Sequence, residues 1–171
     1  MTRTIPRFLF LIGLLLTGCS RSADPLDWKI EGRHLPDLQE SLDRIIASLP
    51  KDLSHEFIFC FNNIKADTLS DQSGTLKEQE DRVCRRLRDK RVREILIEGY
   101  EIAGRASEAQ LDYQSDLLVR LLKRDDRATD ARGKPMSQRI KETKAVIESL
   151  KQKQEKSERR LAELRAQAGG H

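Results

Sequence analysis

Apolar residues recur every three or four positions through most of this chain, and that spacing restricts the available folds more than any other feature. The first such stretch ends at Pro50, and its apolar residues are Leu38, Leu42, Ile45, Ile46 and Leu49. Steps of three and four line one face of an α-helix, whereas a half-buried strand needs strict alternation. No alternation of useful length is found in the sequence. We therefore predict an all-α fold, a small helical bundle with a long C-terminal helix.

The same spacing predicts two more helices in the first half of the chain. One covers about residues 52–66, and Asp52 and Ser54 are placed to cap its start. The other begins near Thr75 and continues or restarts through Tyr100. Both carry a single apolar stripe, as expected of helices that pack on one side.

Gly104 and a later charged segment interrupt the helical pattern in the second half of the chain. Gly104 marks a bend or an end, after which a further helix covers about residues 107–124. Charged residues, a glycine and a proline then interrupt the pattern. The predicted helical domain therefore occupies residues 36–132, and residues 133–171 form the long C-terminal helix and a short disordered tail.

The C-terminal helix, about residues 136–167, is partly heptad-patterned. Its apolar residues at the two seam positions are Ile140, Ile147, Leu150, Leu161 and Leu164. Such repeats form the seam of coiled coils, although polar Gln154 and Ser157 interrupt this one. Two interpretations stay open. The five apolar residues bind a partner protein or a second copy of the chain, or the helix docks along its own chain, which we favour.

The N-terminus has the order of a targeting segment. Two arginines precede an apolar run at residues 8–16, which is far shorter than the ~20 residues that a membrane-spanning helix needs but fits the core of a signal peptide. The run ends in Leu16-Thr17-Gly18-Cys19, which resembles the lipobox of bacterial lipoproteins. The small residues let the peptidase reach the bond before Cys19, whose sulfur takes the diacylglycerol as a thioether. The alternative is an ordinary secretory signal with a chance cysteine.

Lipidation at Cys19 implies a location in the cell envelope. Two or more acyl chains hold a protein firmly on a bilayer. Ser20 stands where the rule for enteric bacteria uses Asp for inner-membrane retention, so we expect the outer membrane, periplasmic side. Residues 1–18 are then the signal peptide, and residues 19–35 are the anchor and a spacer. Trp28 in that spacer either rests at the lipid interface or packs on the domain, and we favour packing.

Charge is abundant but mixed in sign. Charged residues make up 35% of the chain and aromatic residues 5%, which indicates highly charged helices over a thin core. Losing the signal peptide, whose two charged residues are arginines, lowers the formal net charge from +4 to +2. Nucleic acid is therefore not an expected partner of this exported chain.

One basic run stands out, comprising Arg85, Arg86, Arg88, Lys90, Arg91 and Arg93. Its functional interpretation is contact with anionic lipid head groups, peptidoglycan or an acidic partner. Its plainer interpretation, which we favour, is a solvated face balanced by acidic residues close by in the sequence.

Cys60 and Cys84 are the cysteines left once Cys19 is lipidated. An even pair in an oxidising compartment is a disulfide candidate, and closing a loop of this size stabilises a fold by about 3 kcal/mol. The alternative is a pair of buried free thiols that behave as small hydrophobic residues.

Motifs for chemistry are missing from the sequence. His34, His55 and His171 are scattered, and the two cysteines have no flanking ligand set, so no metal site is expected. No nucleophile elbow, phosphate loop or Cys–His catalytic context is visible, and no cofactor is implied.

Two segments resemble a group of small bacterial lipoproteins whose shared helical domain has no known function. Residues 41–50 read Ser-Leu-Asp-Arg-Ile-Ile-Ala-Ser-Leu-Pro, and residues 87–96 read Leu-Arg-Asp-Lys-Arg-Val-Arg-Glu-Ile-Leu. The second departs from the group by having Asp89 in place of Gly and Arg91 in place of Thr. The resemblance covers about residues 36–104, rests on packing residues and implies no activity.

These observations predict a non-catalytic, membrane-anchored lipoprotein whose helices bind an unidentified envelope protein or help to assemble a complex. Self-association through the C-terminal helix is one form of this. The alternative is a lipoprotein that binds anionic lipid or peptidoglycan through the basic run at residues 85–93. An enzyme with a cryptic site is the third and least favoured hypothesis.

Overall fold

The computed structural model describes residues 24–70, 73–124, 129 and 133–169, and its regular elements there are all helical. A 3-10 turn, η1 (Pro25–Asp27), precedes α1 (Leu35–Ser48), α2 (Lys51–Leu69), α3 (Leu76–Leu87), α4 (Val92–Leu122) and α5 (Met136–Ala168). The all-α prediction is confirmed, including the long C-terminal helix. The predicted signal peptide and Cys19 lie outside the described residues.

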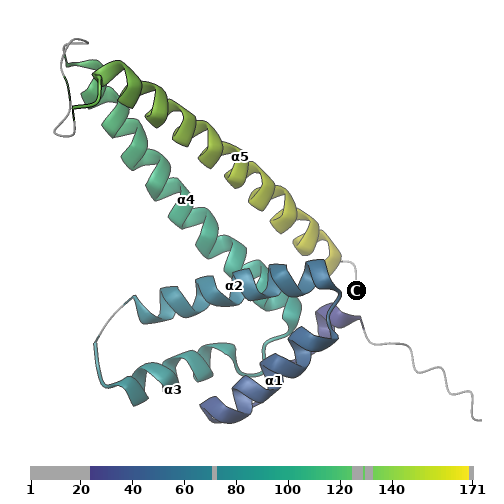
Figure 1. Ribbon diagram of the computed structural model, residues 1–171. Helices are drawn as coiled ribbons and strands as arrows, with labels where there is room; N and C mark the ends of the chain where they lie inside the picture. Colours follow the sequence, from purple (N-terminus) through teal and green to yellow (C-terminus); the bar gives the residue numbers. More distant parts are fainter. Residues whose placement is uncertain (1–23, 71–72, 125–128, 130–132, 170–171) are drawn as a thin grey trace, which may run out of the picture.

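A compact part, here called the base, contains η1, α1, α2, α3 and the adjoining ends of α4 and α5 (Figure 1). Its core gathers the apolar stripes of these helices around Phe57, Ile64, Leu87 and Ile95, all of which are fully buried. Leu164 near the end of α5 joins the same cluster. The three- and four-residue spacing therefore identified the faces that pack together.

The predicted spacer contributes to this base. Ile30 is fully buried, its N–H donates to the Lys90 carbonyl at 2.9 Å, and its own carbonyl accepts from the Asp89 N–H at 3.0 Å. Trp28 packs against the core cluster, as we had favoured. The folded unit thus begins about ten residues earlier than position 36, because an extended segment pairs with the α3–α4 turn.

A two-helix projection, here called the arm, extends beyond the base (Figure 1). It consists of residues 103–122 of α4 and 136–159 of α5, which run antiparallel and contact each other. Its buried apolar residues Leu121, Met136 and Leu150 do not belong to the base cluster. At 1.5 Å rise per residue, the α4 part of the arm is about 30 Å long.

Gly104 neither ends nor divides a helix, so the boundary predicted there is wrong. α4 continues through it from Val92 to Leu122, and a Cβ built on Gly104 would meet nothing within 4 Å. A solvent-facing glycine lowers helix stability by only about 1 kcal/mol relative to alanine. Packing along α5 outweighs that local preference.

The helix start predicted near Thr75 is confirmed. Thr75 caps α3 in a capping box, in which its hydroxyl accepts from the Glu78 N–H and the Glu78 carboxylate accepts from the Thr75 N–H at 2.7 Å. The cap predicted at Asp52 and Ser54 is wrong. α2 starts at Lys51, one residue before the predicted start, and the Ser54 N–H already donates to the Pro50 carbonyl at 2.8 Å inside the first turn.

α2 and α4 cross at a point of close backbone approach. A Cβ built on Gly99 of α4 would lie 2.3 Å from the Cβ of Cys60 on α2. Real Cβ atoms do not approach so closely, so this position accepts only glycine. Gly99 could not be singled out from the sequence, because an isolated glycine within a helical pattern indicates only a mild loss of helix stability.

Candidate functional site

The heptad residues of α5 pack against other helices of the same chain. Leu150 and Leu164 are buried, and Ile140, Ile147 and Leu161 are half-buried on the side that α4 and the base cover. These five residues therefore pack within the chain and hold α5 to it, which is the docking interpretation that we favoured. Met136 and Thr143 were not among the predicted seam residues, but both are buried and continue the seven-residue spacing of Leu150.

Apolar side chains remain exposed on other faces of the arm. Among the described residues, the large hydrophobic side chains that are exposed are Phe59, Leu76, Tyr113, Val119, Leu122 and Val146. The last four of them lie on the arm, and Tyr113 is 66% exposed. Two helices alone cover only one side of each other, so the remaining faces stay open to solvent. This arm is the part of the described chain best suited to meet another molecule.

The basic run at residues 85–93 is largely neutralised within the base. Arg93 is 8% exposed, and its Nη2 lies 3.3 Å from Asp24 Oδ2 and 3.7 Å from Asp27 Oδ1. Arg91 lies 3.6 Å from the same Asp27 oxygen. These cations hold the N-terminal segment against the start of α4. The run is therefore charge-balanced, but the partners of Arg91 and Arg93 are carboxylates distant in the sequence and not the neighbouring acidic residues of the plainer interpretation.

Glu98 gathers two more cations of that run. Its carboxylate accepts from Arg86 Nε at 2.7 Å and also from Lys90 Nζ, while Arg86 Nη1 reaches Asp67 at 2.8 Å on α2. Partial burial pushes the pKa of Glu98 upward, but the hydrogen bonds and charges of Lys90 and Arg86 outweigh it and hold that pKa below its ordinary value. The cluster joins α2, α3 and α4, and its charge is already matched.

A second ion cluster ties the end of α5 to the base. Arg160 donates to both carboxylate oxygens of Glu56, from Nε at 2.6 Å and from Nη2 at 2.9 Å, and Tyr100 Oη donates to the same carboxylate at 2.9 Å. The hydrogen bond from Arg160 to Glu56 raises the pKa of Arg160. Burial, and after it the hydrogen bond that Tyr100 itself donates to Glu56, raises the pKa of Tyr100. Both groups stay protonated, so the cluster serves as a structural clamp.

Cys60 and Cys84 are unbonded in the structure, and both are buried. The disulfide that we predicted is therefore not formed, and the alternative of two buried thiols describes them. Cys60 lies against Gly99 of α4, at the helix crossing. Burial raises the pKa of the Cys60 thiol to about 12, and burial also raises that of Cys84, so neither is a reactive thiolate at neutral pH.

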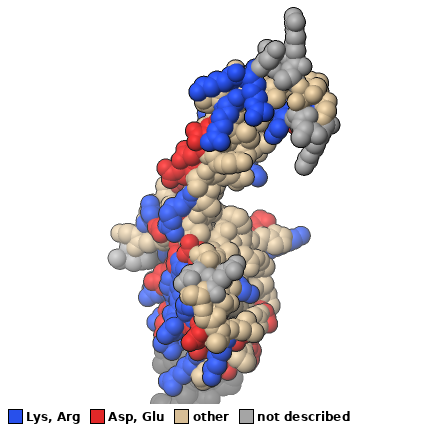
Figure 2. All heavy atoms as spheres, turned by 90° about the vertical axis from the view of Figure 1, so that its left-hand side faces the viewer, with Lys and Arg blue, Asp and Glu red and all other residues tan. Residues whose placement is uncertain are grey.

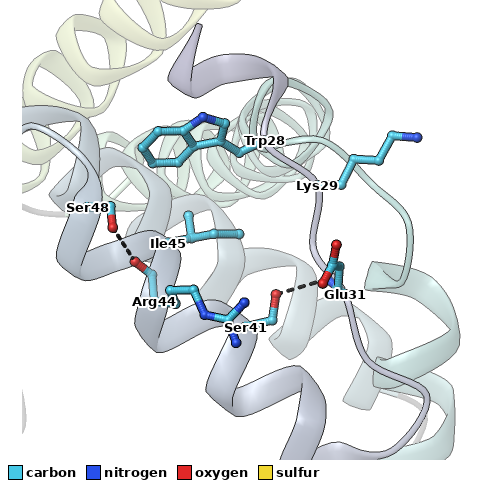
Figure 3. A pocket seen from close by; sticks show the side chains of 7 residues that line it. All are labelled: Trp28, Lys29, Glu31, Ser41, Arg44, Ile45 and Ser48. Atoms are coloured by element: carbon cyan, nitrogen blue, oxygen red, sulfur yellow. Dashed lines mark hydrogen bonds between the residues drawn. The ribbon is translucent and has the colours of Figure 1, made fainter. Parts of the chain in front are cut away.

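A recess of about 270 Å³ lies between the N-terminal segment and α1 (Figure 3). Its lining residues are Trp28, Lys29, Glu31, Ser41, Arg44, Ile45 and Ser48. The indole of Trp28 and the side chain of Ile45 form the apolar part, and the Arg44 guanidinium lies toward Ser41 (Figure 3). Lys29 points away from the recess in the same view.

The polar groups of this recess are mostly engaged with the chain. Ser41 Oγ accepts from the Glu31 N–H at 2.9 Å, Ser48 Oγ donates to the Arg44 carbonyl at 2.8 Å, and Arg44 Nη2 pairs with Glu40 at 3.2 Å. Cationic and anionic side chains both line it, and neither His nor Cys is among them. The recess therefore offers no pairing of a nucleophile with a base, and it lacks one dominant charge that would select a ligand.

The described part of the chain offers no metal site and no membrane-crossing segment. None of its His, Cys, Asp and Glu residues form a group of three that could hold a metal ion. No helix among the same residues is long and apolar enough to cross a bilayer.

Comparison of the chain with protein-family models, with curated proteins and with solved structures gave no match. Function must therefore be inferred from the geometry itself. That geometry consists of a base stabilised by matched ion clusters and an arm whose outer faces are open.

Proposed function

We propose that this chain is a non-catalytic lipoprotein of the bacterial cell envelope that uses its arm to bind another envelope protein. The lipid on Cys19 holds the base at the membrane, and the arm presents a docking surface at a distance from the membrane. The observation that carries this proposal is the arm, two long helices that leave the base and, among the residues that the structure describes, pack along each other (Figure 1).

The ends of the chain support this division of labour. The described chain starts at residue 24 beside the base, only five residues after Cys19, whereas Leu122 at the end of α4 and Met136 at the start of α5 mark the far end of the arm (Figure 1). Five extended residues span at most about 18 Å. A lipid at Cys19 therefore keeps the base near the bilayer and leaves the arm free to reach outward.

The attachment of the arm to the base supports a fixed presentation. Besides the clamp at Glu56, Arg165 Nη2 lies 2.7 Å from Glu101 Oε1, and Leu164 is buried in the base core. α4 is continuous from the base into the arm. A platform held at both helices loses less conformational freedom on binding than a hinged one does.

Two exposed apolar residues on the flanks of the arm provide the docking surface. Tyr113 and Val146 are 66% and 41% exposed, one on each helix. Aromatic and apolar side chains of this kind, surrounded by charged neighbours, are typical of protein–protein contacts. An interface centred on them needs about 800 Å² from this chain, which fits the flank of a 30 Å hairpin.

Affinity purification from solubilised envelopes tests the proposal. The full lipid-anchored chain is compared with the double variant Tyr113→Glu/Val146→Glu and with Leu76→Glu, a control on an apolar residue of the base that is more exposed than either arm residue. We expect a defined partner to co-purify with the wild type and with Leu76→Glu but not with the arm variant. Equal recovery with all three proteins, or loss only with Leu76→Glu, contradicts the proposal.

A further inference from the structure

The end of the arm concentrates positive charge. Residues 120–144 contain nine Lys and Arg residues and four Asp and Glu residues, a net charge of +5. The rest of the chain after residue 18 contains 21 cationic and 24 anionic residues, a net charge of −3. The positive charge of the mature protein therefore resides at one end of the molecule.

Here the arm tip denotes the described residues 120–124 and 133–144. Its cations are Arg120, Lys123 and Arg124 on the α4 side and Lys134, Arg139, Lys141 and Lys144 on the α5 side. All except Arg139 are exposed, and Glu142 is the one carboxylate among the described tip residues. Figure 2 shows Lys and Arg gathered at this end, with acidic side chains lower along one edge of the arm.

The arm tip differs from the basic run at residues 85–93 in how its charge is used. In the base, Arg86, Lys90 and Arg93 are each held by carboxylates of the chain itself. At the tip, the pair between Lys134 and Glu142, at 3.3 Å, is about half exposed, so water and salt weaken it. The tip therefore keeps a net positive charge, whereas these cations of the base are neutralised by carboxylates of the chain.

Apolar side chains accompany these cations. Leu122 is 57% exposed and stands directly before Lys123 and Arg124, and Val119, one residue before Arg120, is 50% exposed. Basic residues that flank exposed leucine or valine suit the boundary between lipid head groups and acyl chains, where the cations meet phosphates and the apolar groups enter the hydrocarbon. A soluble acidic partner would use the charges but gain less from Leu122.

We propose that the arm tip binds the surface of an anionic phospholipid bilayer. This goes beyond the protein contact proposed above, because it uses the end of the arm and not its flanks, and neither proposal depends on the other. A protruding end also suits a flat surface. The described chain begins at residue 24 beside the base, so the tip lies at the end of the molecule opposite to that start (Figure 1).

Vesicle co-sedimentation tests this inference. The whole mature chain, with Cys19→Ser so that it carries no lipid of its own, is mixed with vesicles of phosphatidylcholine with or without phosphatidylglycerol. We expect binding only with phosphatidylglycerol and progressive loss of binding as salt is raised. Each exposed cation near such a surface changes partitioning about fivefold, so Lys123→Glu/Arg124→Glu should weaken binding by at least about 25-fold.

Two matched controls make the outcome specific. Arg85→Glu/Arg88→Glu reverses two exposed charges on the base and should leave binding nearly unchanged. Leu122→Ser should weaken binding severalfold, whereas Leu76→Ser, on the base, should not. Helix content measured by circular dichroism confirms that each variant is folded.

Three results would overturn the inference. They are equal binding to both kinds of vesicle, equal loss from the base and tip charge reversals, and vesicle binding that survives the tip reversal. If the wild type binds soluble polyglutamate but not phosphatidylglycerol vesicles, the tip recognises an acidic polypeptide and the lipid proposal is wrong.

Discussion

Arg160 and Glu56 are 104 residues apart in the sequence, yet the guanidinium of Arg160 donates to both oxygens of the Glu56 carboxylate, at 2.6 and 2.9 Å. Tyr100 completes the cluster from α4. One carboxylate on α2 is therefore hydrogen-bonded to both helices that form the arm, in the parts of these helices that belong to the base. Bidentate pairs of this type combine charge with geometric specificity.

Removing the clamp should loosen the end of α5. We expect Arg160→Ala to lower the free energy of unfolding by about 2 kcal/mol, because it leaves the mostly buried Glu56 carboxylate with fewer donors. Arg165→Ala, which removes a more exposed pair with Glu101, should change it by less than about 0.5 kcal/mol. Urea unfolding measures both, and equal effects of the two substitutions would contradict the role of the clamp.

The two glycines of α4 should respond in opposite directions to alanine. Gly99→Ala places a methyl group against Cys60 and should destabilise the fold by about 1–3 kcal/mol, since α2 and α4 must move apart. Gly104→Ala meets open space and should stabilise α4 by up to about 1 kcal/mol. Thermal unfolding of the pair provides the comparison. A stabilised Gly99→Ala protein would mean that the helices do not cross as described.

Asp89 offers a local test of the α3–α4 turn. Its φ is +65°, in the left-handed region that side chains other than Gly and Asn or Asp seldom adopt. Asp89→Gly should therefore be more stable than Asp89→Ala by about 1 kcal/mol, as measured by denaturant midpoints.

Acid should weaken the base through Glu98. Because the pKa of its carboxyl is held below the ordinary value, its pairing stabilises the fold at neutral pH and is lost as the pH falls through the lowered pKa. Glu98→Gln should thus destabilise the protein at pH 7 by about 1–3 kcal/mol, and the difference from wild type should shrink below about pH 4. Unfolding curves at several pH values test this. A difference that grows in acid would reverse the assigned sign.

Much of the fold could be predicted because it depends on local periodicity. The stripes of α1, α2 and α5 and the start of α3 near Thr75 follow from spacings of three and four residues. The matched charges of residues 85–93 could not be predicted, because Asp24 and Asp67 lie far away in the sequence. Neither could the arm tip, whose cations lie around the end of α4 and the start of α5, two segments that only the fold brings together. A heptad pattern also does not say whether its partner belongs to the same chain.

Site-specific photo-crosslinking in cells tests whether the arm is the surface that meets another envelope protein. The photoreactive residue is placed at Tyr113 or Val146 of the arm, or at Leu76 of the base. We expect a discrete crosslinked species from both arm positions and none from Leu76, and a loss of that species when Cys19→Ser removes the anchor. Crosslinks from Leu76 alone, or none from either arm position, would contradict this expectation.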